Sequence, residues 1–349
     1  MAQQSGENIP VAAAQAQSPL RWIVKGEIHD EFKSEFIKQD KHKTVVILDN
    51  NSGDRTADRQ VSKKLCEKIK TYQQDCLVAL SYWGQAATDA VTTLLPYKDS
   101  LSGLIMLQDF VVGGGEGREQ VSAHFANLNV PVIKAIKSFD RTQFARNVSM
   151  DGIAGEKVYY QIAMPELQGV TQPLVVATLG PSHIHTLSGL QLDSLAIDEH
   201  SVELLVERLN RWHTLQVKSN KDKKLAIVYY NHPPGRHNIG ADNLDVPASI
   251  WQILQQLQTA GYDLGTLPND QAALLDLMQT QGVNLPNNRD ALMVMKDKIH
   301  TMSRDDYSKY FKTLPSVIQQ EMTQGPFGYL HITLQHAIEQ GEISFATQR

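Results

Sequence analysis

The sequence is poor in cysteine. Cys66 and Cys76 are the only two in 349 residues, and they form neither a CxxC pair nor a zinc-ligand pattern. The two could form a disulfide. However, Cys66 falls on the apolar face of an expected helix and Cys76 opens an expected strand, so we predict two buried thiols. The cysteines therefore leave the redox compartment open.

Long apolar runs are also missing. No stretch approaches the ~20 residues needed to span a bilayer, so no transmembrane segment is predicted. The first twenty residues are polar and rich in Gln and Ala, and they lack the basic and apolar regions of a signal peptide. We expect residues 1–40 to form a disordered or irregular lead-in. The expected location is the cytoplasm, and the periplasm is the alternative if a native signal peptide has been removed.

An excess of basic residues is absent as well. The chain has 33 Lys and Arg against 38 Asp and Glu, a net charge of −5. This balance gives no electrostatic footprint for nucleic acid, so no nucleic-acid partner is expected. Apolar residues make up 42% and charged residues 20%, which is typical of a globular protein. The length is sufficient for two domains.

Familiar catalytic and metal-binding motifs do not occur. There is no serine nucleophile elbow and no HExxH. The glycine run Gly113–Arg118 is not followed by the Lys-Ser/Thr pair of a phosphate loop, so we predict a flexible connection. His183 and His185 could share a metal on one face of a strand. Because a third ligand is not evident nearby, we expect solvated histidines on an exposed loop. No catalytic residue and no metal ligand is therefore predicted.

What the sequence does contain is an alternation of apolar runs and amphipathic stretches. Buried strands are predicted at Thr44–Asn50, Cys76–Trp83, Leu101–Val112 and from Pro131. Helices are predicted between them around Val61–Ile69, Ala86–Leu95 and Glu119–Leu128. This order predicts an α/β fold made of consecutive parallel-sheet units, Rossmann-like or flavodoxin-like, with helices on both faces.

The second half is predicted to continue in the same way. Strands at Tyr159–Met164 and Leu174–Leu179 would form an irregular, strand-rich insert in a first domain at 41–220, which ends with a helix at Glu199–Leu215. The charged run Lys218–Lys224 is the expected boundary. The second unit, 221–349, would hold strands at Leu225–Tyr230 and Tyr262–Pro268, helices at Val246–Ala260 and Gln271–Gln281, and a helical C-terminal segment.

The loop Asn231–Asp245 is the strongest candidate for a binding site. It leaves the carboxyl end of an expected parallel strand, where open α/β sheets place their ligand crevices. Asp245 could cap the next helix, whose N-terminus would favour an anionic group. An ordinary exposed loop with a good helix cap is the alternative. The candidate substrate-binding residues are His232, Arg236, His237, Asn238, Gly240 and Asp245.

The segment Leu225–Pro268 closely resembles a stretch of cobaltochelatase and magnesium chelatase large subunits. Their pattern runs K-x-A-I, P-P-G, G-x-A/G-x-x-L-D/N, P-A-S and L-x-x-L-x-x-x-G-Y. The matching positions include Lys224, Ala226, Ile227, Pro233, Pro234, Gly235, Gly240, Leu244, Asp245, Pro247, Ala248, Ser249, Gly261 and Tyr262. Met164–Gly169 is similar to the family's P-E-x-D-G, with Gln168 where an acid is usual. Tyr307–Pro315 also resembles the family's segment ahead of its longer C-terminal region.

The resemblance implies a subunit that holds a tetrapyrrole, a corrin precursor or a porphyrin, while separate AAA+ subunits hydrolyse ATP with Mg. Cobalt, magnesium or iron would be the metal transferred, and no cofactor is expected on this chain. The family's H-x-G-x-H-G-x-x-E-W-L-P-G-K segment does not occur in the sequence. This chain alone is therefore expected to be inactive in metal insertion. The alternatives are a non-catalytic docking module of such a complex and a haem- or corrin-handling relative.

Overall fold

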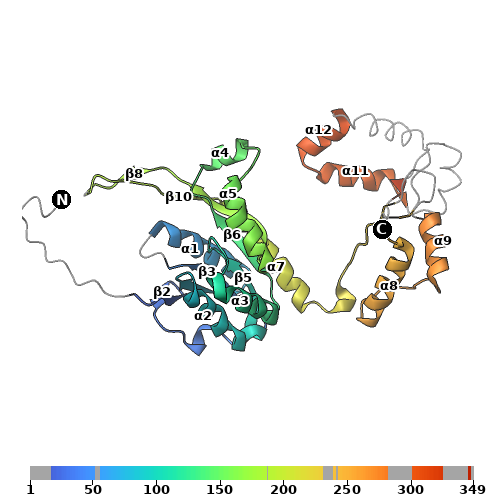
Figure 1. The fold of residues 1–349 in the computed structure, drawn as a ribbon. Coiled ribbons are helices and arrows are strands. Elements are labelled where there is room, and N and C mark those ends of the chain that lie inside the picture. The colour runs from blue at the N-terminus through green and yellow to red at the C-terminus, as the bar shows by residue number, and fades with distance from the viewer. Residues whose placement is uncertain are drawn as a thin grey trace, which may run out of the picture. The chain divides into compact units, whose positions relative to one another are not determined.

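The computed structural model describes residues 17–51, 56–186, 188–230, 239–240, 243–281, 301–324 and 345–346 (Figure 1). The chain divides into two compact units, Met1–Val217 and Lys218–Arg349. Each unit is described here by itself. None of the helices within the described ranges is long and apolar enough to cross a bilayer.

An eight-stranded mixed sheet forms the centre of the first unit. Its order is β10-β7-β6-β5-β3-β4-β1-β2, in which β4, β3, β5, β6 and β7 are parallel and β1, β2 and β10 pair antiparallel at the two edges. The strands are β1 (Leu20–Val24), β2 (Glu27–His29), β3 (Thr44–Asn50), β4 (Asp75–Ser81), β5 (Leu101–Met106), β6 (Val132–Lys137), β7 (Thr171–Leu179) and β10 (Leu195–Ile197). The five parallel strands follow the 2-1-3-4-5 order of flavodoxin-like folds.

Helices cover both faces of this sheet. Since side chains of a strand alternate between faces, β3 sends Val46 and Leu48 to one side and Val45 and Ile47 to the other. The first side packs against α2 and α3, and the second against α1 and α7. The helices are α1 (Thr56–Thr71), α2 (Gln85–Leu94), α3 (Gly114–Leu128) and α7 (Glu199–Val217). Burial on both faces explains why the parallel strands read as continuous apolar runs.

Shorter elements fill the connections of the first unit. They are η2 (Ser34–Phe36), η3 (Leu95–Ser100), α4 (Gln143–Val148), α5 (Gly155–Val158), the π-helix η4 (Tyr159–Ala163), α6 (Met164–Leu167) and the hairpin β8 (His183–Ile184) with β9 (Gln191–Leu192). The second unit is mainly helical where it is described. It contains η5 (Asn220–Asp222), α8 (Val246–Thr259), α9 (Gln271–Gln281), α11 (Arg304–Thr313), α12 (Ser316–Gln324) and the pair β11 (Thr301–Met302) and β12 (Phe345–Ala346).

The predicted α/β class is confirmed, but three expected strands are wrong. Tyr159–Met164 lies in the helical run α5–η4–α6, and neither Leu225–Tyr230 nor Tyr262–Pro268 is a strand. The second parallel sheet is therefore not found among the described residues. The first forty residues also differ from the expected irregular lead-in. From Leu20 onward they supply β1 and the edge strand β2, which meet in a two-residue turn with φ of 52° at Lys25 and 93° at Gly26.

The two cysteines form a disulfide, so the prediction of free thiols is wrong. Cys66 on α1 and Cys76 on β4 have Cα atoms 5.4 Å apart, within the range that a disulfide spans. Both side chains are half-buried rather than part of the sealed core. The sequence placed each cysteine on the correct element. It could not show that α1 packs directly over the start of β4, which brings the two sulfurs together.

Replacing both cysteines, Cys66→Ser with Cys76→Ser, should lower the free energy of unfolding by about 2 to 3 kcal/mol, because the bond closes a short loop in the unfolded chain. Urea unfolding of the variant and the oxidised protein measures the difference. The unsubstituted protein in dithiothreitol is the control, and it should unfold at the same urea concentration as the variant. Equal stability of the variant and the oxidised protein would contradict the bond.

Candidate functional site

The carboxyl ends of the parallel strands define the candidate site. Strands β3, β4, β5 and β6 all end at the same edge of the sheet, because they run in the same direction. The connection after β3 leads to α1 on one face of the sheet, whereas the connection after β5 leads to α3 on the opposite face. Such a switch between neighbouring strands is where open α/β sheets place their ligands.

A buried polar network lies at this edge. Lys137 of β6 donates to Asp49 of β3 over 2.8 Å, and both side chains are about 3% exposed. Lys134 donates to the carbonyl oxygen of Gln108, and the Gln108 amide donates to Ser81 over 2.7 Å. The network therefore connects the ends of four strands. A buried ion pair contributes little net stability, but removal of one partner would leave an uncompensated charge.

Lys134 is the most perturbed titratable group of the network. Its side chain is 1% exposed, and burial lowers the pKa of its amino group from 10.5 to about 8. The nearby carboxylates Asp109 and Asp49 oppose this effect, and Lys137 adds to it. The bond to the Gln108 carbonyl oxygen also compensates part of the cost of burying the cation.

Two buried acceptors in the same place have no hydrogen-bond partner within the part of the chain that the structure describes. They are the side-chain oxygens of Gln108 and Gln161. Gln161 itself donates to Asp109 over 3.1 Å. A buried acceptor without a donor is costly, so these oxygens favour a water or a ligand donor at this edge.

A row of aromatic side chains, Trp83, Phe110, Tyr160 and Tyr159, lies above the network. We call it the aromatic ledge. Neighbouring ring centroids are 6.3, 5.4 and 5.2 Å apart along the row. Trp83 is 59% exposed, and both tyrosines are 53% exposed. Because the tyrosines belong to the π-helix η4, an element often found at functional sites, the ledge combines exposure with an unusual backbone.

Gln168 and a glycine hold the ledge in place. The Trp83 indole donates to the Val111 carbonyl oxygen over 3.2 Å. Gln168 accepts from the Val112 amide at 2.9 Å and donates to the Val112 carbonyl oxygen at 2.8 Å. A carboxylate could accept the first bond but could not donate the second. A Cβ at Gly114 would lie 3.1 Å from the Trp83 ring, so the loop also needs this glycine for close approach.

The connections that follow the same strand ends carry further exposed apolar side chains. Further exposed side chains follow the ends of β4 and β6, namely Tyr82, Phe139, Phe144, Val148 and Met150. Arg141 fixes this segment through a 2.8 Å ion pair with Asp151, which holds the pKa of that carboxyl at about 2. Several exposed apolar side chains in neighbouring connections are consistent with a binding surface.

The sequence-predicted site residues belong to the second unit, and the structure describes two of them, Gly240 and Asp245. His232, Arg236, His237 and Asn238 lie outside the described residues. A Cβ at Gly240 would meet no atom of the chain within 4 Å, and the proposed role of Gly240 in close approach to a ligand stays a prediction. Asp245 caps α8 by accepting from the Ala248 amide at 3.0 Å, as predicted. Its proposed contact with substrate stays a prediction.

Two further expectations have clear outcomes. Gly113–Arg118 is not a flexible connection, since Gly114 begins α3 and a Cβ at Gly117 would lie 2.6 Å from the Thr88 hydroxyl. Close packing of α2 against α3 therefore explains the glycines. His183 and His185 are exposed on the β8–β9 hairpin, as expected. Within the described ranges, no three or more His, Cys, Asp or Glu side chains are placed to hold a metal ion.

Sequence reasoning missed the ledge and the buried lysines. The ledge residues come from three separate connections, so no spacing in the sequence joins them. A signal for the lysines was present, because Lys134 and Lys137 interrupt the otherwise apolar strand Val132–Lys137. Charged residues within a buried strand usually matter for function or stability.

Comparisons with known proteins agree on one family. The family model described as CobN/Magnesium Chelatase matches residues 9–336. A magnesium-chelatase subunit from Chlorobaculum parvum is 30% identical over 155 residues, covering 44% of this chain and 11% of that protein. The chloroplastic magnesium-chelatase subunit ChlH of Oryza sativa is 32% identical over 186 residues, 51% of this chain and 12% of that protein.

Cobalt-branch proteins match as well. The aerobic cobaltochelatase subunit CobN of Pseudomonas aeruginosa is 28% identical over 190 residues, covering 54% of this chain and 15% of that protein. The solved catalytic subunit of cobaltochelatase from Mycobacterium tuberculosis has a TM-score of 0.58 at 20% identity, over 90% of this chain and 25% of that one. This likeness establishes the fold. The chain thus spans a small part of the length of its relatives.

Lys134→Met should change how stability depends on pH. Below about pH 8 the lysine is charged in both the folded and unfolded states, so its burial cost is fully present. Between about pH 8 and 10.5 the folded state releases the proton first, and stability rises with pH. Relative to the variant, the unsubstituted protein should therefore gain up to about 3 kcal/mol of unfolding free energy across this range.

Urea unfolding at several pH values between 7.5 and 10.5 measures this gain. Lys98→Met, which removes an exposed lysine, controls for the loss of a positive charge. Parallel pH profiles for the unsubstituted protein and the Lys134 variant would show that the amino group is not perturbed by burial.

Proposed function

The chain belongs to the CobN/magnesium chelatase family, and on that premise we propose that it contributes a tetrapyrrole-contacting wall to a chelatase large subunit. The observation that carries this proposal is the aromatic ledge at the carboxyl edge of the sheet. Three of its four rings, Trp83, Tyr159 and Tyr160, are exposed, and neighbouring ring centroids lie 5.2 to 6.3 Å apart.

A flat, conjugated macrocycle suits such a surface. Aromatic rings attract other π-systems in offset or edge-on geometry and remove apolar area from water at the same time. The polar network beneath the ledge adds fixed donors and acceptors, among them the unpartnered oxygens of Gln108 and Gln161. The site thus combines apolar contact with a few polar groups, the usual composition of a small-molecule site.

From the family resemblance, we also propose that the loop Asn231–Asp245 of the second unit contacts a tetrapyrrole. In this proposal Arg236 and His237 bind propionate or amide groups of the tetrapyrrole, and Asn238 and Gly240 shape the loop. An arginine–carboxylate contact adds charge-assisted, bidentate hydrogen bonds. His232 and Asp245 complete the proposed set, Asp245 from its position at the N-terminus of α8.

Metal insertion itself would depend on other parts of the assembly. We assign ATP hydrolysis, with its Mg ion, to separate AAA+ subunits, and cobalt, magnesium or iron would be the metal substrate. This chain alone is expected to bind a macrocycle without inserting a metal.

The disulfide bears on where the protein works. Disulfides persist mainly in oxidising compartments, and the chain's two cysteines are paired. We therefore favour the periplasmic alternative over the cytoplasmic one.

A docking module is the second candidate function. The exposed apolar side chains Phe144, Val148 and Met150 are also what an ATPase or another partner subunit would cover. Tight association with AAA+ subunits, combined with no affinity for any tetrapyrrole, would favour this function over the first.

Trp83→Ala should weaken tetrapyrrole binding about tenfold, because the largest ring of the ledge is lost. We would titrate the full chain with protoporphyrin IX, haem and a metal-free corrin, following absorbance and tryptophan quenching. Trp212→Ala is the matched control, since Trp212 is also exposed but lies on α7. Equal affinities of the two variants for the bound macrocycle would remove the ledge from the site.

Arg236→Ala should also weaken binding of a carboxylate-bearing tetrapyrrole, again by about tenfold, by removing a charge-assisted contact. Its thermal unfolding should match that of the unsubstituted protein. A tetrapyrrole whose propionates are esterified provides the control, because the substitution should not change its affinity. Unchanged affinity for the free acid in the variant would contradict the role of Arg236.

A further inference from the structure

A cavity of about 450 Å³ lies beside α1 in the first unit, away from the ledge. Strands β1, β2 and β4 contribute its floor through Ile23, Ile28 and Val78. This volume is within the range of roughly 300 to 1,000 Å³ that is typical of small-molecule sites. Cys76 stands near the start of β4, whereas the ledge lies past the strand ends, so the two sites are separate.

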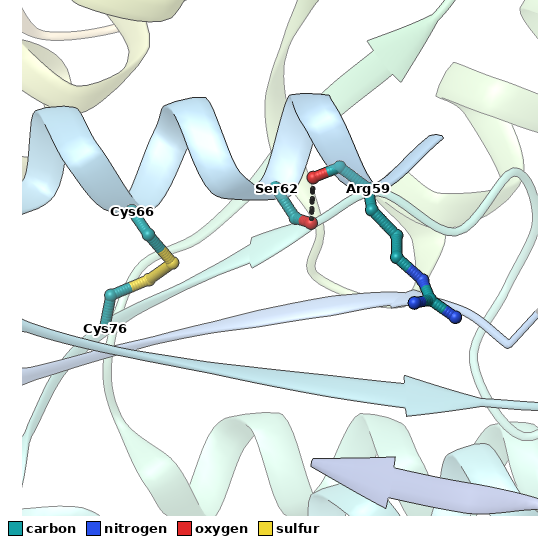
Figure 2. The surroundings of a disulfide bond; sticks show 4 residues. All are labelled: Arg59, Ser62, Cys66 and Cys76. Atoms are coloured by element: carbon teal, nitrogen blue, oxygen red, sulfur yellow. Dashed lines mark hydrogen bonds between the residues drawn. A yellow bond between two sulfur atoms is a disulfide. The ribbon is translucent and has the colours of Figure 1, made fainter. Parts of the chain in front are cut away.

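The disulfide forms part of the cavity wall. Figure 2 shows Cys66 of α1 joined to Cys76 of β4, with Ser62 and Arg59 projecting from the same side of the helix. All four residues line the cavity. The spacing of 59, 62 and 66 places them on one stripe of α1, since residues three and four apart share a helix face. The covalent bond fixes this stripe against the sheet.

Most of the charged residues that line the cavity are cationic. Lys25 is presented by the tight β1–β2 turn, and Arg59, Lys63 and Lys70 come from α1. Among the described residues that line the cavity, Glu67 is the acidic one. This local excess of cations contrasts with the net charge of −5 for the whole chain.

Two other lysines of α1 form ion pairs that join this helix to α7. Lys64 and Lys68 face α7 and form ion pairs of 2.8 and 2.6 Å with Glu199 and Glu203. Lys63 and Lys70, on the cavity side, form no ion pair with any residue that the structure describes. Lysines that line an apolar cavity and have no carboxylate partner are free to bind an anion.

We propose that this cavity is a binding site for a small amphipathic anion, one with a flat apolar body and a carboxylate, sulfonate or phosphate group. The apolar body would contact Ile23, Val78 and the disulfide, and the anionic group would lie between Lys63, Lys70 and Lys25. This site is independent of the proposed tetrapyrrole contact, because it uses other residues at another part of the sheet.

Fluorescence titration with 8-anilinonaphthalene-1-sulfonate tests the site on the full, oxidised chain. The double variant Lys63→Gln/Lys70→Gln should bind this probe about tenfold more weakly. Lys64→Gln/Lys68→Gln, which removes the same charge from the other side of α1, should bind it as the unsubstituted protein does. The uncharged N-phenyl-1-naphthylamine should bind the two variants equally. Added salt should weaken binding of the anion.

The disulfide provides a second, local readout. Because the chain contains two cysteines, thiols released by dithiothreitol report this bond alone. The sulfonate probe should slow their release in the unsubstituted protein and in the Lys64/Lys68 variant, at concentrations that match its dissociation constant. It should give little protection in the Lys63/Lys70 variant.

Two results would overturn the proposal. One is equal affinity of both double variants for the sulfonate, which would place the probe elsewhere. The other is thiol release that saturating probe does not slow. Either result would leave the tetrapyrrole titration unaffected, because the ledge variant Trp83→Ala is scored separately with a different ligand.

Discussion

The central parallel sheet is covered on both faces, and this constraint determines where the first unit can carry chemistry. Strands β3, β5 and β6 have almost no exposed side chain, because α1 and α7 cover one face and α2 and α3 the other. Polar groups of these central strands can then reach a ligand only where the strands end. The buried lysines show the cost of this arrangement. Lys134 and Lys137 stay inside by bonding to Gln108 and Asp49 at the strand ends.

The same constraint explains how much of the fold the sequence could predict. A strand buried on both faces is a continuous apolar run, so Thr44–Asn50 was predicted with its observed bounds. The local sequence pattern does not predict secondary structure where contacts with distant parts of the chain determine it. Tyr159–Met164 has β-favouring residues, yet it is helical and places Gln161 against Asp109. Leu225–Tyr230 is apolar, but Val228 is 93% exposed, and no neighbouring strand pairs with it among the described residues.

Sites assembled across the sheet could not be predicted from spacing. The ledge unites Trp83, Phe110 and the two tyrosines of η4 from connections that follow different strands. Gln168 shows that a sequence difference does not reveal its own structural reason. It stands where the resembling family has an acid, and in the structure its amide both accepts from and donates to the Val112 backbone. The disulfide is a third case, because only the packing of α1 over β4 reveals it.

The charges around the ledge limit what it can recognise. Lys137 is paired with Asp49, Lys157 lies 3.4 Å from Asp140, and Lys134 donates to a backbone carbonyl. These cations already have partners within the chain. The ledge is therefore suited to stacking with a ligand rather than to binding its carboxylates. A tetrapyrrole on the ledge would then be held through its apolar face, because stacking does not depend on a free cation.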